Sequence, residues 1–273
     1  MRRPEALLLL CSGMLLLAAC AKSGVATTIK PPRIKGSEQI AQPYRVQDGA
    51  DTKRRVKVRD MIGLASQRLA NGELAAAREL AGKALRLDPG SVEALTVLAV
   101  VEDTLGNAQQ AGAHYRRAAE LAPGWGEVLN NYGAWLCASG HAAEALVWFD
   151  RALADPAYRQ PAAALANAGG CALRSGQVER AAEDLRQALA LDPNNAYALA
   201  SMAQLQYDRG QYLSARAFNE RRLAAAPADA SVLQLAVKIE ERLGDKAASS
   251  RYRQRLREEF PEAVTADSGE DRQ

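Results

Sequence analysis

The stretch GQVERAAEDLRQALALDP, residues 176–193, decides the fold, because its pattern recurs along the chain at a nearly fixed period. It begins with a glycine, has the small residue Ala181 five positions later and ends with Pro193. The glycine and the small residue occur together six times. The glycines are Gly72, Gly106, Gly140, Gly176, Gly210 and Gly244, and the small residues are Ala77, Ala111, Ala145, Ala181, Ala215 and Ser249. The closing prolines are Pro89, Pro123, Pro193, Pro227 and Pro261.

Each position of this pattern has a physical reason. Glycine takes the left-handed conformation that ends one helix and turns the chain into the next. The small residue sits where two helices cross closely. Proline lacks an amide hydrogen and disfavours helix in its predecessor, so it closes the second helix. A period of 34 residues is that of the tetratricopeptide repeat, a helix-turn-helix unit.

We therefore predict an all-α fold, a superhelical array of six tetratricopeptide repeats over residues 56–262. One pair of helices cannot bury its own apolar face, but stacked pairs bury a continuous one. The third repeat ends in a loop two residues longer than the others, Asp155–Pro161, and residues 263–273 form an acidic tail predicted to be disordered. The repeats run at about 58–91, 92–125, 126–161, 162–195, 196–229 and 230–262.

The amino terminus has the features of an export signal. Arg2 and Arg3 precede a short apolar run over 7–17, which is shorter than the about 20 apolar residues that a transmembrane helix needs. The run ends in Leu17-Ala-Ala-Cys20, which resembles a bacterial lipobox. We predict cleavage of residues 1–19 between Ala19 and Cys20, and fatty acids such as palmitate on Cys20. The alternative is an ordinary signal peptide with an incidental cysteine.

Residues 20–55 are expected to form the lipidated cysteine and a flexible tether, because they contain prolines and polar residues without a helical apolar period. Ala21 stands where an aspartate would resemble the signal for retention at the inner membrane. The absence of an aspartate at this position favours the periplasmic face of the outer membrane as the location.

Catalysis is not expected. The net charge of +3 is close to balanced, so nothing calls for a nucleic acid partner. His114 and His141 have no metal-ligand spacing, and no HExxH, P-loop or Gly-x-Ser-x-Gly motif occurs. We predict no metal and no cofactor other than the lipid on Cys20.

Cys137 and Cys171 lie on adjacent first helices, which are about 8–10 Å apart, so we expect two small hydrophobic residues rather than a disulfide.

What remains is binding. In a tetratricopeptide array the first helices line a concave groove through recurring positions. Asn131 and Asn167 share one such position, and their amides suit an extended peptide backbone; alternatively, they cap a local turn or face water. Ala134 and Gly170 either leave room for a ligand chain or reflect tight packing. The predicted groove comprises Ile62, Ser66, Thr96, Val100, Asn130, Asn131, Asn167, Tyr197, Gln204 and Tyr207.

The third and fourth repeats carry a closer resemblance. The run Val128-Leu-Asn-Asn-Tyr-Gly133, the loop Asp155-Pro-Ala-Tyr158 and the run Ala166-Asn-Ala-Gly169, together with the lipobox, resemble the type IV pilus biogenesis and stability lipoproteins. This is the pilotin family called PilF or PilW, and the resemblance extends from the lipobox to about Pro261. The chain departs from the repeat pattern at Ala81, where an aromatic residue is usual.

The resemblance implies a lipoprotein that binds the secretin subunit of the type IV pilus. The lipoprotein sorting machinery would carry it to the outer membrane, where it would promote secretin insertion and multimerisation. One alternative is a tetratricopeptide lipoprotein that serves barrel assembly or recruits peptidoglycan hydrolases. Another is an enzyme with a repeat-borne site, which the lack of clustered catalytic residues disfavours.

Overall fold

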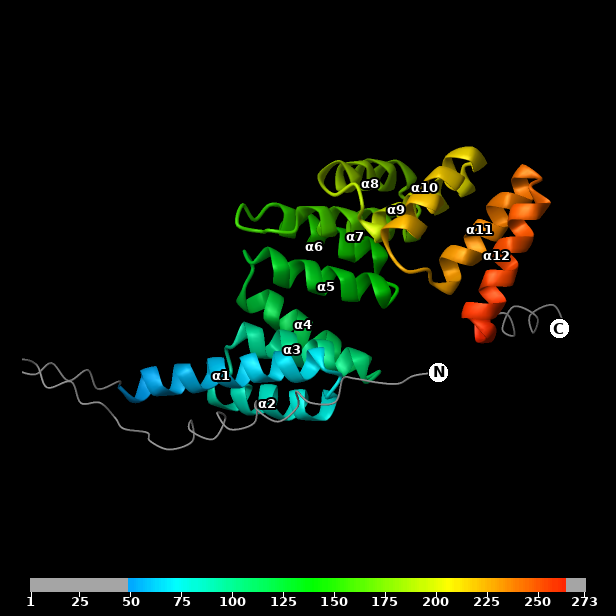
Figure 1. The fold of residues 1–273 in the computed structure, drawn as a ribbon. Coiled ribbons are helices and arrows are strands. Elements are labelled where there is room, and N and C mark those ends of the chain that lie inside the picture. Colours follow the sequence, from blue (N-terminus) through cyan, green and yellow to red (C-terminus); the bar gives the residue numbers. More distant parts are fainter. Residues whose placement is uncertain (1–48, 264–273) are drawn as a thin grey trace, which may run out of the picture. The chain divides into compact units, whose positions relative to one another are not determined.

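The computed structural model describes residues 49–263, which fold into twelve α-helices (Figure 1). The predicted export signal, Cys20, the tether as far as residue 48 and the acidic tail from residue 264 lie outside the described residues. Over the described range, no helix is long and apolar enough to cross a membrane. The helices are α1 Ala50–Ala70, α2 Leu74–Leu87, α3 Val92–Thr104, α4 Ala108–Leu121, α5 Gly126–Ala138, α6 Ala142–Leu153, α7 Pro161–Arg174, α8 Val178–Leu191, α9 Ala196–Asp208, α10 Tyr212–Ala225, α11 Ala230–Leu243 and α12 Lys246–Glu259.

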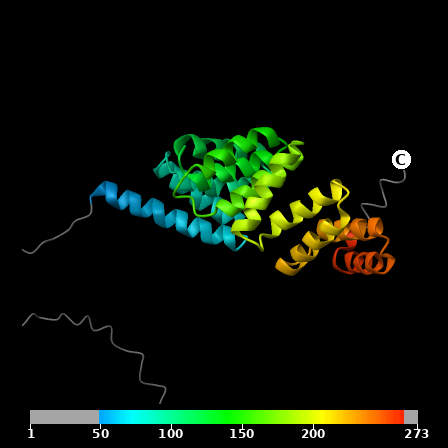
Figure 2. The same cartoon turned by 90° about the horizontal axis from the view of Figure 1, so that it is seen from above.

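The helices form six consecutive pairs, and each pair packs against the next in chain order (Figures 1 and 2). Within a pair, the first helix packs on the second, as α5 does on α6 and α7 does on α8. Between pairs, the second helix of one repeat contacts the first helix of the following repeat. This arrangement confirms the predicted all-α tetratricopeptide fold.

The recurring glycine and small residue have the roles that the sequence predicted. All six turn glycines have φ between +73° and +87°, a region that side chains on an L-residue disfavour. Five of the six small residues are fully buried, and Ser249 is 2% exposed. Both features fix the close crossing of the two helices in every repeat.

Helix α1 starts earlier than expected, at Ala50 rather than at residue 56. Almost every side chain before Val58 is exposed. The first turns of α1 therefore lie outside the packed part of the helix. Asp51 lies in the first turn, where a carboxylate favours the helix, and pairs with Arg54 at 2.7 Å and Arg55 at 3.3 Å.

The loop after the third repeat is longer than the sequence suggested. It covers residues 154–160, seven residues, whereas 122–125 and 192–195 each contain four. The difference is three residues rather than two: α6 ends two residues earlier in its repeat than α4 and α8 do, which lengthens the loop, and α7 begins one residue early at Pro161, which shortens it. Proline suits the first turn of a helix, since that amide needs no intrahelical partner.

Candidate protein-binding face

The first helices of the repeats, α1, α3, α5, α7, α9 and α11, share one exposed side. In α5 the buried side chains include Val128, Leu129 and Tyr132, whereas Glu127 and Asn131 lie on the other side of the helix and are exposed or half-buried. We call this side of the six helices the first-helix face. Its predicted binding residues are Ile62, Ser66, Thr96, Val100, Asn130, Asn131, Asn167, Tyr197, Gln204 and Tyr207.

The aliphatic members of this set mainly belong to the core. Ile62 and Val100 are half-buried and pack against buried residues of their own and neighbouring helices. Thr96 is half-buried, and its hydroxyl donates to the carbonyl of Val92 at 2.9 Å. These three residues therefore leave little free surface for a partner.

The polar and aromatic members are more accessible. Ser66 and Gln204 are exposed, and the Gln204 amide donates to the Asp208 carboxylate at 2.7 Å. Tyr207 is half-buried, and its ring centroid lies 5.5 Å from that of Tyr212. The surface offered by the first-helix face is thus mostly amide, hydroxyl and tyrosine.

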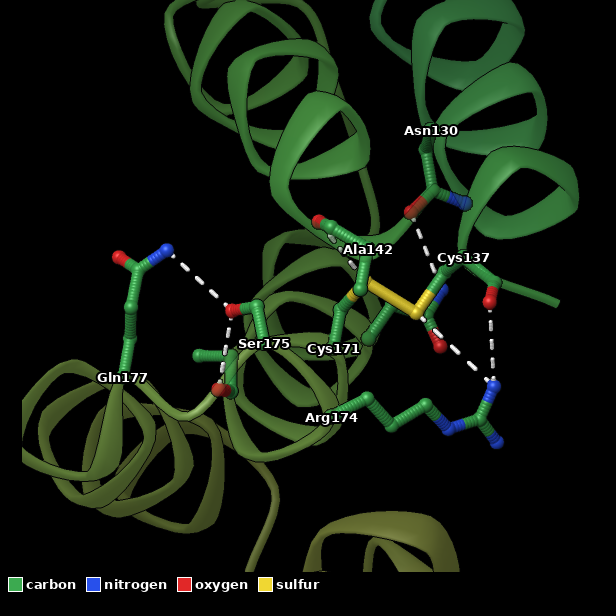
Figure 3. Close-up of a disulfide and its surroundings, with 9 residues drawn as sticks. Asn130, Cys137, Ala142, Cys171, Arg174, Ser175 and Gln177 are labelled. Carbon is green, nitrogen blue, oxygen red and sulfur yellow. Dashed lines mark hydrogen bonds between the residues drawn. A yellow bond between two sulfur atoms is a disulfide. The ribbon is translucent and has the colours of Figure 1, made fainter. Parts of the chain in front are cut away.

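A disulfide joins α5 to α7 (Figure 3). Cys137 and Cys171 are both buried, and their Cα atoms lie 5.9 Å apart. The expectation of two unpaired small residues was wrong, because it compared the distance between helix axes with a limit that applies to Cα atoms. Cα atoms lie about 2.3 Å from their helix axis, so facing residues of neighbouring helices approach much more closely than the axes do.

Side-chain hydrogen bonds also link the same helices. The Asn167 amide donates to the Asn130 side-chain oxygen at 3.1 Å, and the Arg174 guanidinium donates to the Cys137 carbonyl at 3.4 Å (Figure 3). Asn131 and Asn167, which share a repeat position, therefore have different environments. Asn131 is half-buried, and its side chain forms no hydrogen bond within residues 49–263. Its amide is the one that remains open for a ligand backbone.

The sequence left Gly170 open between room for a ligand chain and tight packing, and the structure fills the space with another side chain. A Cβ atom at this position would come within 2.3 Å of the Tyr197 hydroxyl oxygen and within 2.8 Å of its ring. Tight packing between α7 and α9 is therefore the reason for this glycine, and Tyr197 covers it while remaining 43% exposed.

An aromatic cluster formed by side chains of α4, α5 and α6 was not anticipated from the sequence. Tyr132 is stacked on Trp135 with ring centroids 6.1 Å apart and meets the edge of Trp148 at 4.8 Å. Tyr115 lies 6.3 Å from Trp135, and burial raises the pKa of Tyr115 to about 12. Gly112 makes this packing possible, because a Cβ atom there would overlap the Trp135 ring. The four aromatic residues hold α4, α5 and α6 together.

The long loop packs back onto the start of α5. The Asp155 carboxylate accepts hydrogen bonds from the backbone N–H groups of Gly126 at 2.8 Å and Ala157 at 2.9 Å, which lowers the pKa of Asp155. Tyr158 lies directly against Gly126, and burial raises the pKa of Tyr158 to about 12. The loop that carries part of the family resemblance therefore positions the amino end of a first helix.

The histidines have local roles. His141 is exposed, and its Nδ1 lies 3.1 Å from the Ser139 carbonyl, whereas His114 is half-buried and burial lowers its pKa. Across the part of the chain that the structure describes, no group of three or more His, Cys, Asp or Glu residues is arranged to hold a metal ion.

The six stacked helix pairs with their left-handed turn glycines define a tetratricopeptide repeat fold. A family model described as "Tetratricopeptide repeat" matches residues 172–239. The chain is 26% identical over 219 residues to the type IV pilus assembly protein PilF of Pseudomonas aeruginosa, covering 80% of this chain and 85% of that protein.

Two solved structures extend the comparison. PilW, described as a widely conserved type IV pilus biogenesis factor, superposes with a TM-score of 0.71 and 29% identity, covering 77% of this chain and 97% of PilW. The structure of Pseudomonas aeruginosa PilF gives a TM-score of 0.69 and 25% identity, covering 81% of this chain and all of that chain. The protein is homologous to PilF and PilW, and this homology supports a role in type IV pilus biogenesis.

Proposed function

We propose that this protein is an outer-membrane lipoprotein adaptor of the pilotin type, which binds the secretin subunit of the type IV pilus. It would promote the localisation of the secretin to the outer membrane and its assembly into a multimer. The observation that carries the proposal is the similarity to PilF along 80% of the chain, at matching repeat architecture.

The first-helix face is the surface proposed to bind the secretin. An extended peptide needs partners for its backbone amides and carbonyls, and a side-chain amide such as that of Asn131 supplies a donor and an acceptor. The disulfide and the Asn130–Asn167 bond already fix α5 against α7. A peptide that binds across these helices therefore orders little of the protein, which favours affinity.

The lipid on Cys20 is proposed to supply the location. Each buried methylene contributes about 0.8 kcal/mol, so several acyl chains hold a protein at a bilayer almost permanently. The lipoprotein sorting machinery would deliver the protein to the periplasmic face of the outer membrane. A secretin subunit exposes strand edges until its barrel closes, so an escort at that membrane prevents wrong pairing. The function proposed is binding, without catalysis.

The test is secretin assembly in cells that carry Cys20→Ala, compared with wild type and with a full deletion. Heat-resistant secretin multimers and their membrane fraction are quantified, and the amount of the variant is checked by immunoblot. We expect fewer multimers, or multimers in the inner membrane, while the variant remains stable. Normal assembly at the outer membrane in both the variant and the deletion strain would contradict the proposal and favour a role in barrel assembly or hydrolase recruitment.

A further inference from the structure

Helix α1 carries a surface that the repeat fold does not use. It has 21 residues, whereas the other eleven described helices have 12 to 14. Among its first eleven residues, 50–60, only Val58 is buried. Figures 1 and 2 show these turns, in blue, running on beyond the part of α1 that packs on α2. This end of α1 is therefore open to a partner.

Positive charge is concentrated in these turns. Residues 50–60 contain five basic and two acidic side chains, a net charge of +3, which equals the net charge of the whole chain. Arg54 and Arg55 share the single carboxylate of Asp51. Lys53 and Lys57 are exposed and form no ion pair with any residue from 49 to 263. The two lysines are free to bind anions.

Apolar side chains lie on the same side of the helix as these lysines. Val56 is 39% exposed and Leu64 is 40% exposed, and Met61 is half-buried between them in sequence. Val56 follows Lys53 by three residues, and Met61 and Leu64 follow Lys57 by four and seven, so these side chains lie along one stripe of the helix. Asp60 lies on the same stripe, and its carboxylate is 3.8 Å from the guanidinium of Arg59. A stripe that combines cations with exposed apolar side chains is typical of a helix lying in a membrane interface, where lysine stems extend to the headgroups.

We propose that the stripe Lys53, Val56, Lys57, Met61 and Leu64 binds the surface of an anionic phospholipid bilayer. Its charge is complementary to such a surface, and α1 begins at Ala50, within the last residues of the predicted tether 20–55. A flexible tether of about thirty residues, as the sequence predicts, would span roughly 30 Å, so the proposed lipid anchor at Cys20 would keep α1 within reach of the bilayer. Ile62 and Ser66 lie on the opposite side of α1 by helical geometry, so lipid contact leaves the first-helix face accessible.

The test uses the unlipidated chain 21–273 in flotation with vesicles. Within residues 49–263 the buried core residues lie between Val58 and Leu256, so removing residues 1–20 deletes none of them. We expect the chain to float with vesicles of phosphatidylcholine and phosphatidylglycerol, but not with phosphatidylcholine alone, and to be released by high salt. Each cation near an anionic surface contributes about a fivefold gain in binding, so Lys53→Glu with Lys57→Glu should reduce binding by more than about tenfold.

Arg159→Glu with Lys246→Glu is the matched control, because it changes the charge equally at two exposed sites outside α1. This variant should float almost as the parent chain does, and Val56→Ser with Leu64→Ser should lose part of the binding. Circular dichroism verifies that all variants remain folded. No flotation, equal binding to neutral vesicles, or equal loss in the control would overturn the proposal. Because the assay contains neither secretin nor the lipid anchor, its result is independent of the proposed pilotin function.

Discussion

The third and fourth repeats differ from the fifth and sixth in what holds them together. Nine residues after the turn glycine, Phe149 and Leu185 are fully buried in the central repeats, whereas the fifth repeat has the buried polar residue Asn219. The Asn219 side-chain oxygen has no hydrogen-bond partner within the described chain. The central repeats also have the disulfide between α5 and α7. The same backbone repeat therefore tolerates an apolar, cross-linked interior and a polar one.

The polar interior depends on ion pairs. The guanidinium of Arg216 contacts the carboxylate of Glu240, which is buried, and the nearly buried Arg222 lies 3.0 Å from Asp229. In each pair one charge is buried, Glu240 or Arg222, and a buried charge contributes less net stability than apolar packing of the same volume because it loses its hydration. In a repeat array, stability is approximately a sum over repeats and their interfaces. We therefore expect α5–α8 to open less readily than α9–α12.

The largest expected effect is the loss of the Phe149 ring. Phe149→Ala should reduce the free energy of unfolding by about 3–5 kcal/mol, because it leaves a cavity among fully buried residues. Denaturant unfolding followed by circular dichroism measures this change. Phe218→Ala in α10 is the control, since Phe218 is only half-buried. An equal or larger loss in the control would remove the distinction between the two regions.

The next effect comes from the disulfide. Cys137→Ala combined with Cys171→Ala opens a link between residues 34 positions apart, which should reduce stability by about 3–4 kcal/mol in the chain-entropy description. Hydrogen exchange should become faster in α5 and α7 and should change little in α11 and α12. Adding a reductant to the wild-type chain should reproduce the result. Exchange that accelerates equally in all twelve helices would show that the link does not act on the central repeats in particular.

A stabilising substitution in the fifth repeat tests the same comparison between the central and the carboxy-terminal repeats. Asn219→Leu replaces a buried side chain whose amide oxygen has no partner with an apolar side chain of nearly the same shape, so it should raise stability by about 1–3 kcal/mol. The control is Asn130→Leu, which removes the bond to Asn167 and should lower stability by about 0.5–1.5 kcal/mol. Slower hydrogen exchange in α10 and α11 would locate the gain. A loss of stability in Asn219→Leu would mean that the amide is satisfied in solution.

The smallest effects are expected from two carboxylates, one in each region. Hydrogen bonds from Gly126 and Ala157 lower the pKa of Asp155. For Asp229, burial raises the pKa, but the hydrogen bonds from Ser231 and Val232 and the charge of Arg222 outweigh it, so the net pKa is lowered. A lowered pKa means that the ionised form stabilises the fold. That contribution is complete above the ordinary value of 3.8 and is lost as the pH falls through the folded-state pKa.

Thermal melts of Asp155→Asn and Asp229→Asn over a pH series measure these contributions. Each variant should be less stable than wild type at neutral pH, and each difference should shrink as the pH falls below 3.8. A difference that persists unchanged at the lowest pH would assign the effect to something other than ionisation.

Much of the fold could be predicted from the sequence, because its determinants are local. A left-handed turn requires glycine, and a close helix crossing requires a small residue, so Gly72 and Ala77 already define the first repeat. The start of α1 could not be predicted in this way. Its first turns bury almost nothing, and without burial the helix has no apolar period to detect.

The candidate site was predicted less well, because it depends on how adjacent helices are staggered. Repeat position alone made Asn131 and Asn167 equivalent, but the stagger brings Asn167 to Asn130 instead. Cys171 likewise meets Cys137, although the two cysteines do not occupy equivalent positions. Sequence spacing gives the period of the array, whereas these contacts require the three-dimensional relation of α5 to α7.

The central claim, that the first-helix face binds the secretin, is tested most directly by measuring the binding of purified secretin subunit to two variants of the third repeat. Asn131→Arg places a large charged side chain on the first-helix face, and Val147→Arg places the same side chain on α6, where Val147 is 57% exposed. We predict that Asn131→Arg weakens binding by at least about tenfold, equivalent to about 1.4 kcal/mol, and that Val147→Arg binds as wild type does. Unchanged binding in Asn131→Arg, or an equal loss in both folded variants, would contradict this assignment.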